Sequence, residues 1–152
     1  LCHRDYHGQN LLVVDDTIFV IDYQDVRPGP DTYDMASLLR DRGVARIIGD
    51  ATEEAFLEDY RDRSGAAPGM RRRYFETLLQ RSIKILGTFS AQPILRARMH
   101  YLDFIPATLE SIRRCIEELP GYEALRDMFP LAFDLDTARK RARELNDARS
   151  SS

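Results

Sequence analysis

Two short apolar runs near the start of the chain constrain its fold more than any other feature. Residues 11–14 and 18–21 are rich in leucine, valine and isoleucine, and Asp15-Asp16-Thr17 between them is a polar stretch of hairpin length. A two-stranded hairpin is only marginally stable by itself. We therefore expect the rest of the chain to supply a helical layer that packs against these strands.

The remaining sequence is patterned for helices, so we expect an α+β, mostly helical fold with about five of them. Apolar spacing predicts a helix over residues 33–42, stopped by Gly43. The other predicted helices cover 52–64 with Thr52 as N-cap, 70–91 ended by Pro93, 95–119 with a kink or break at Pro106, and 122–128. The charged tail, residues 136–152, is expected to be a solvated helix that frays into disorder.

The composition is that of a soluble globular protein. The 152 residues suit one domain, and 43% hydrophobic with 31% charged residues excludes a disordered chain. The sequence lacks an apolar run long enough to span a membrane and a signal peptide, and two cysteines are too few for a disulfide framework. We therefore expect a cytoplasmic protein. A net charge of −3 makes nucleic acid and anionic membranes poor partners.

The densest chemical signal is the segment His3-Arg4-Asp5-Tyr6-His7-Gly8-Gln9-Asn10, followed by Asp22 after the second apolar run. A hairpin folds its two open ends to the same side, so Asn10 and Asp22 are expected to converge. Both offer hard oxygen ligands of the kind that Mg²⁺ prefers. Asp5 lies nearby and could accept a proton from a substrate hydroxyl.

The spacing matches the catalytic loop of protein kinases, H-R-D-x-x-x-x-N followed by a metal-binding aspartate. Two departures are clear: Tyr23-Gln24-Asp25 follows the metal aspartate, and His7 stands where Ser/Thr protein kinases have a lysine. With these departures the chain resembles the aminoglycoside phosphotransferase and choline kinase family, the small-molecule branch of the kinase fold. The segments HRDYHGQNLL, VIDYQDVRPGPDTYDMASLLRD and, more weakly, YLDFIPATLESI are most similar to bacterial anomeric amino-sugar kinases of cell-wall recycling.

This resemblance implies ATP-dependent phosphorylation of a small-molecule hydroxyl, most closely the anomeric hydroxyl of N-acetylmuramate or N-acetylglucosamine. It implies that Asp5 is the catalytic base. It further implies that Asn10 and Asp22 hold Mg²⁺ on the phosphates of ATP.

The same resemblance assigns roles to the flanking residues. Asp25 is expected either to support the metal site or to contact the acceptor sugar. From their position directly after Asp22, Gln24 and Asp25 could present an amide and a carboxylate to that sugar. His3, Arg4 and Asp34 are expected to support the catalytic loop, Asp34 by bracing its backbone from the start of a helix.

The resemblance also implies a missing part. None of the eight glycines falls in a G-x-G-x-x-G or Walker A pattern, and no lysine precedes the catalytic loop. The family carries both on an N-terminal lobe. We therefore expect the C-terminal lobe of a kinase-like fold without its N-lobe, inactive alone. Residues 1–33 would form the catalytic and metal loops, 34–135 a helical subdomain and 136–152 the tail.

Two rival functions stay open. An aminoglycoside or choline-type kinase would use the acidic first part, since residues 1–70 carry a net charge of −7; against it, the predicted helices over 70–119 hold nine basic and five acidic residues. The other rival is a non-catalytic pseudoenzyme or partner-binding fragment. The absent lobe favours that rival, and the intact Asp5, Asn10 and Asp22 disfavour it.

Several residues have a structural explanation that we prefer to a functional one. His3 and His7 could bind zinc with Asp5, but i, i+4 pairing needs a helix and a strand follows. The run Arg71-Arg72-Arg73 is expected to be a solvated helix face. Cys115 is expected to be buried among apolar residues, and Tyr23 to pack.

Overall fold

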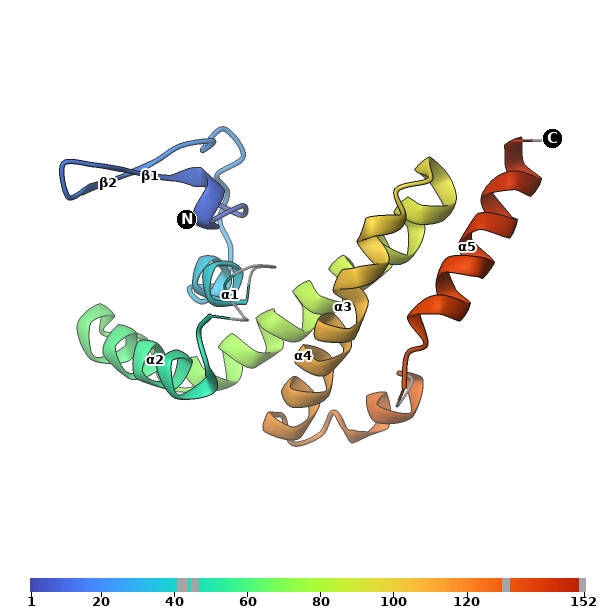
Figure 1. Cartoon of the computed structure of the whole chain (residues 1–152). Coiled ribbons are helices and arrows are strands. Elements are labelled where there is room, and N and C mark those ends of the chain that lie inside the picture. The colour runs from blue at the N-terminus through green and yellow to red at the C-terminus, as the bar shows by residue number, and fades with distance from the viewer. Residues whose placement is uncertain (41–43, 45–46, 130–131, 151–152) are drawn as a thin grey trace. The chain divides into compact units, whose positions relative to one another are not determined.

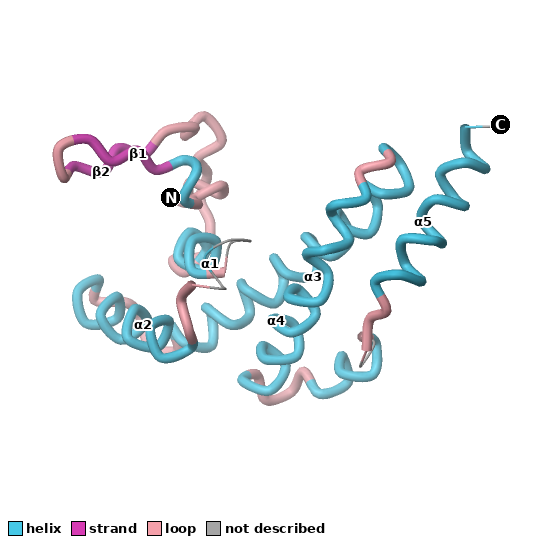
Figure 2. The backbone as a smooth tube through the Cα atoms, viewed as in Figure 1, coloured by secondary structure: helices cyan, strands magenta, loops and turns pink. Residues whose placement is uncertain are grey.

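The structure of the protein is a computed structural model that describes residues 1–40, 44, 47–129 and 132–150. The chain divides into two compact units, residues 1–78 and 79–152, and Figure 1 shows its course from the N- to the C-terminus. Most of the described chain is helical, and its strands pair into a two-stranded antiparallel sheet (Figure 2). The predicted α+β, mostly helical class is therefore confirmed.

The hairpin consists of β1 (Leu11–Val14) and β2 (Thr17–Val20), with Leu11 opposite Val20 and Val14 opposite Thr17. Asp15 and Asp16 form the turn with φ of 46° and 59°, the left-handed values of a type I′ hairpin turn. Thr17, expected in the turn, is the first residue of β2. Seven of the eight strand residues are exposed. The expectation of a helical layer over the strands is therefore wrong for the described residues.

The helices of the first unit are α1 (Tyr33–Leu39), α2 (Asp50–Ser64) and the beginning of α3 (Met70–Arg96). Helix α2 begins two residues before the predicted N-cap at Thr52, because the extended backbone of Gly49 caps it instead. The predicted stop at Gly43 lies outside the described residues. The buried apolar side chains of this unit are Cys2, Ala36, Leu39, Leu57, Met70, Tyr74, Phe75 and Leu78.

The prediction that Pro93 ends its helix is wrong, because α3 continues to Arg96. A proline removes one backbone donor and strains the turn before it. Here Pro93 is fully buried in the last turns of the helix, where its neighbours Phe89 and Ile94 belong to the apolar core. Burial of these side chains outweighs the lost hydrogen bond.

The single helix predicted over residues 95–119 is two elements. A 3₁₀ helix, η3 (Met99–Phe104), precedes α4 (Ile105–Glu118). The break predicted at Pro106 is confirmed, since this residue lies in the first turn of α4, where its missing N–H has no partner to lose. Cys115 on α4 is buried, as predicted.

The second unit is completed by η4 (Glu123–Met128), a 3₁₀ helix, and α5 (Leu135–Ser150). Helix α5 covers most of the tail that was expected to be solvated. One side of it is packed: Ala142 is buried in the apolar cluster, and Asn146 donates from Nδ2 to the carbonyl of Ile94 at 2.9 Å. The cluster around it holds Phe89, Leu102, Ile105 and Leu109, with partly buried Ile85, Leu86, Ile94, Met99, Tyr101, Phe104, Phe129, Phe133, Leu135 and Ala138.

None of the described helices has both the length and the apolar character that a membrane crossing requires.

Candidate active site

The segment that precedes the hairpin is held in place by the loop that follows it. The backbones of Cys2 and Arg27 exchange hydrogen bonds of 2.8 and 3.1 Å, and the Cys2 thiol donates to the carbonyl of Pro30. A Cβ atom on Gly29 would lie only 2.8 Å from the Cys2 sulfur. Only glycine allows this close approach. Burial raises the pKa of the Cys2 thiol, so this cysteine is a packing group rather than a nucleophile.

Asp34, in the first turn of α1, binds the backbone of this segment. Its Oδ2 accepts the N–H of His3 at 2.6 Å, and its Oδ1 accepts the N–H of Arg4 at 2.9 Å. The His3 ring is buried, with Nε2 at 2.8 Å from the carbonyl oxygen of Ile21. The Asp34 carboxylate thus connects the loop to α1, and the His3 ring connects it to the end of the hairpin.

Two residues beside the proposed reacting groups have left-handed backbones. Arg4 has φ of 74° and Asp22 has φ of 64°, a region that costs a non-glycine residue of order 1–3 kcal/mol. The two N–H bonds to Asp34 fix the first of these conformations. Such strain is concentrated at functional sites, where surrounding contacts enforce it.

Asp5 and Asn10 lie together. The Asn10 amide nitrogen donates to the Asp5 carbonyl at 2.8 Å and to its carboxylate Oδ2 at 3.3 Å. Asn10 is itself fixed by its backbone, since its N–H bonds to His7 at 2.9 Å and its carbonyl accepts the N–H of Ile21 at 3.0 Å. These bonds close η1 (Gly8–Asn10), a single 3₁₀ turn, and place Asn10 opposite Ile21, next to Asp22.

The donor atoms at this end of the hairpin suit a magnesium ion. The Asn10 nitrogen is used on Asp5, and among the described residues no hydrogen bond reaches its amide oxygen, which could therefore bind a ligand. Asp22 is exposed, and its Oδ1 accepts the Gln24 amide at 2.6 Å, which leaves Oδ2 for a ligand. An amide oxygen and a carboxylate are the hard donors that Mg²⁺ takes, usually with waters and phosphate oxygens beside them.

The other predicted substrate contacts are less organised. Asp25 lies 3.9 Å from Arg27, and both side chains are exposed. No contact joins Asp25 to Asp5 in the described part of the chain. Tyr23 is exposed rather than packed as expected. The described ranges also offer no trio of His, Cys, Asp or Glu side chains placed to hold a metal, so the zinc alternative gains no support.

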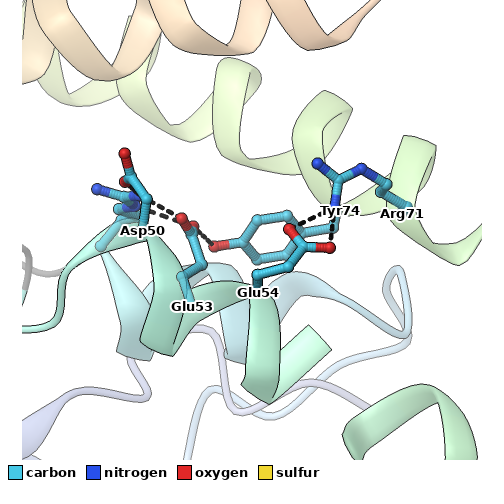
Figure 3. A network of polar contacts seen from close by, with 6 residues as sticks. Asp50, Glu53, Glu54, Arg71 and Tyr74 are labelled. Carbon is cyan, nitrogen blue, oxygen red and sulfur yellow. Dashed lines mark hydrogen bonds and ion pairs between the residues drawn. The ribbon is translucent and has the colours of Figure 1, made fainter. Parts of the chain in front are cut away.

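A buried polar network holds the C-terminal end of α1 through Arg40, which caps that helix (Figure 3). Glu53 of α2 is fully buried; it accepts hydrogen bonds from the guanidinium of Arg40 and from the hydroxyl of Tyr74 on α3. Arg40 also pairs with Asp50 at 2.8 Å. Because these bonds connect α1 to α2 and α3, they fix the helix whose first turn carries Asp34.

The arginine run that opens α3 is used in ion pairs. Arg71 pairs with Glu54, Arg72 with Glu76 at 2.9 Å, and Arg73 with Asp31 at 2.7 Å.

Sequence reasoning gave no role to His7. Its Nε2 lies 3.3 Å from the Asp5 carboxylate, and its ring is mostly buried. The signal that could have identified it is its position, two residues after the proposed base, where Ser/Thr protein kinases have a lysine.

The sequence model of the phosphotransferase enzyme family matches residues 1–75, the stretch that holds Asp5, Asn10, Asp22 and Asp34. This match confirms the resemblance drawn from the sequence.

Two curated relatives refine the comparison. Both carry the name N-acetylmuramate/N-acetylglucosamine kinase. The protein from Neisseria meningitidis serogroup B is 29% identical over 151 residues, which cover 88% of this chain and 41% of the relative. The protein from Pseudomonas putida is 29% identical over 136 residues, 84% of this chain and 40% of the relative. The chain thus spans about two fifths of the length of these relatives.

Proposed function

We propose that the chain contributes the catalytic loop and metal-binding residues of an ATP-dependent kinase that phosphorylates a small-molecule hydroxyl. The observation that carries the proposal is the contact between Asp5 and Asn10 at the open end of the hairpin. Asn10 is paired with Ile21 on the other side of the hairpin, and Asp22 is the next residue. This arrangement offers a proton acceptor and oxygen ligands side by side. The family match over residues 1–75 supports the same chemistry.

The reaction assigns one task to Asp5. The carboxylate accepts the proton of the acceptor hydroxyl as the hydroxyl oxygen bonds to the γ-phosphorus of ATP. The bond between that phosphorus and the bridging oxygen breaks, and ADP leaves with the electron pair. Positioning of the hydroxyl is the main contribution of such a base, because phosphoryl transfer involves little covalent chemistry by the protein.

Asn10 and Asp22 would hold Mg²⁺ through the amide oxygen and the carboxylate that the structure leaves available. Bound there, the ion neutralises charge on the phosphate oxygens. His3, Arg4 and Asp34 would keep the loop in place, with Arg4 in its left-handed conformation, as their hydrogen bonds indicate.

We further propose that the nucleotide-binding site is completed by an N-terminal lobe that lies outside residues 1–152. Residues 1–152 contain no G-x-G-x-x-G loop. The phosphates therefore need donors from another segment, and residues 1–135 would act as the C-lobe beneath it. By itself the chain would be inactive. Neither Cys2 nor Cys115 forms a disulfide, which suits a reducing compartment and a cytoplasmic enzyme.

The acceptor we propose is N-acetylmuramate or N-acetylglucosamine, phosphorylated at the anomeric hydroxyl. Both curated relatives are named N-acetylmuramate/N-acetylglucosamine kinase, and the anomeric position is our proposal. Gln24 and Asp25 follow Asp22 directly and could hydrogen-bond sugar hydroxyls and an acetamide. The excess of basic residues over 70–119 disfavours a polycationic aminoglycoside.

An acceptor screen tests the proposal. The natural protein that carries these residues is incubated with ATP, Mg²⁺ and each acceptor, and ADP release is measured. We expect turnover with the two N-acetyl sugars and none with kanamycin or choline. Turnover with kanamycin or choline but not with the N-acetyl sugars would refute the proposed acceptor and support the proposed kinase activity. Absence of turnover with every acceptor would favour a non-catalytic fragment.

A further inference from the structure

His7 lies against the proposed base from a mostly buried position. Its Nε2 is 3.3 Å from Asp5 Oδ2; the His7 side chain is 16% exposed and that of Asp5 is 62% exposed. An exposed carboxylate is free to rotate unless something holds it. The buried ring therefore is the fixed member of this pair.

The backbone explains why the ring is fixed. His7 has an extended backbone, with φ of −147° and ψ of 168°, immediately before η1. Its carbonyl accepts the N–H of Asn10, which closes that turn. A shift of His7 would therefore disturb Asn10 as well.

The partners of the two ring nitrogens indicate which one carries the proton. Nδ1 is buried and has no hydrogen-bond partner among the described residues, whereas Nε2 has a carboxylate beside it. A neutral imidazole has one N–H and one acceptor nitrogen. Placing the hydrogen on Nε2 gives it an acceptor, so the ring donates toward Asp5.

The same carboxylate oxygen then has two donors. Asn10 Nδ2 and His7 Nε2 both lie 3.3 Å from Oδ2, and in the described part of the chain nothing contacts Oδ1. Two donors on one oxygen would fix the rotation of the carboxylate and leave the other oxygen as the proton acceptor. Both distances are slightly longer than the usual hydrogen-bond limit of about 3.2 Å. Contacts between catalytic groups are often long without substrate and shorten in the reacting complex.

We propose that His7 is a positioning residue that holds the Asp5 carboxylate through Nε2, so that Oδ1 faces the acceptor hydroxyl. The inference rests on the proposed function, in which Asp5 is the base. It assigns to His7 a role in orientation, without a change in its own protonation during turnover.

The test compares substitutions that keep or remove a donor at the position of Nε2. In the natural protein, His7→Leu removes the donor, and His7→Asn ends too early to reach Oδ2. Both should lower kcat by roughly 10- to 100-fold, the usual cost of misplacing a reacting group, with the KM for ATP little changed. Glutamine places its amide nitrogen near the position of Nε2, so His7→Gln should lose less than either.

The control is His100, an exposed histidine beside Tyr101 in the second unit, whose substitution by leucine should leave kcat unchanged. A second readout is the spectrum of ¹⁵N-labelled histidine, in which the His7 signal, identified by its loss in His7→Gln, should show hydrogen on Nε2. A wild-type kcat in His7→Leu, or hydrogen on Nδ1, would overturn the inference. Equal losses in the glutamine, asparagine and leucine variants would also do so.

The double variant separates this inference from the proposed function. If Asp5 is the base and His7 acts through it, Asp5→Asn with His7→Leu should be no slower than Asp5→Asn alone. Full activity in Asp5→Asn would refute the base itself. A slow Asp5→Asn made slower still by His7→Leu would refute only the role of His7.

Discussion

Asp34 accepts the backbone N–H of Arg4 at 2.9 Å while Arg4 has a left-handed backbone, and 30 residues separate the two in sequence. The other oxygen of the same carboxylate holds the N–H of His3 at 2.6 Å. The strained loop before the proposed base is thus fixed by a side chain from the first turn of α1. Loop conformation and helix position are therefore coupled.

We predict that Asp34→Ala lowers the free energy of unfolding of the 152-residue chain by about 2–4 kcal/mol, because two backbone donors lose a charged acceptor. Urea denaturation measures the change. Asp127, exposed on η4, provides the control, and Asp127→Ala should change stability by less than about 0.5 kcal/mol. Equal effects of the two substitutions would show that Asp34 does not support the loop.

Asp5 and Asp22 should differ in what their loss affects. In the natural protein, Asp5→Asn should reduce kcat by about 10²–10⁴-fold and preserve nucleotide affinity, since it removes only the proton acceptor. Asp22→Asn should weaken Mg²⁺-dependent nucleotide binding as well as turnover. Calorimetric titration with ATP and Mg²⁺ separates the two. Weak nucleotide binding in Asp5→Asn with normal kcat at saturation would reverse the assignments.

The buried network at Glu53 should contribute far more stability than the exposed pair next to it. Glu53→Gln removes the buried carboxylate that faces the Arg40 guanidinium and leaves only its pair with the exposed Asp50, a change that costs about 3–5 kcal/mol. Glu54→Gln is the matched control: its pair with Arg71 is about 40% exposed on both sides and should cost less than about 1 kcal/mol. Denaturation midpoints compare them. Similar losses would mean that Glu53 contributes no more than a surface ion pair.

The pair between Asp31 and Arg73 should give the chain an acid-sensitive component of stability. Hydrogen bonds from the Arg73 guanidinium hold the pKa of Asp31 below its usual range. A lowered folded-state pKa stabilises the fold above the unfolded-state pKa of about 3.9, and this stabilisation is lost as the pH falls through the folded value. Because the pair is partly exposed, its size should not exceed about 1 kcal/mol.

Arg73→Met should therefore reduce the loss of stability between pH 5 and pH 2, measured by urea denaturation at each pH (these pH limits are roughly those of carboxylate titration). Arg149→Met, an exposed change on α5, should leave that loss unaltered. If Arg73→Met lost as much stability at acid pH as the wild-type chain, the Asp31–Arg73 pair would not be the cause of that loss.

The exposed hairpin should cause the isolated chain to self-associate. Leu12, Val13, Val14, Ile18 and Phe19 are all exposed on two short strands, and contiguous apolar surface of this kind promotes association. Replacing Val13 and Phe19 by lysine should lower the weight-average molar mass of the chain, measured by sedimentation equilibrium. Met128→Lys adds charge at another exposed apolar residue and should not change it. A monomeric wild-type chain would contradict this prediction.

The features that could be predicted from the sequence are local in the chain. The spacing from His3 to Asn10 and the two apolar runs predicted the loop and the hairpin, because a strand pair joined by two residues has little choice of register. The break at Pro106 followed from the chemistry of one residue. These patterns depend on neighbours within a few positions, so they can be recognised without knowledge of the remaining structure.

Only the tertiary structure decided the features that depend on distant residues. Pro93 stays inside α3 because the burial of its neighbours outweighs its missing donor, and α5 is packed on one side because Ala142 meets residues more than 30 positions away. The position of His7 against Asp5 depends on its burial, which no local pattern records. Such outcomes are sums over many contacts between elements, whereas a motif reports only which groups are present.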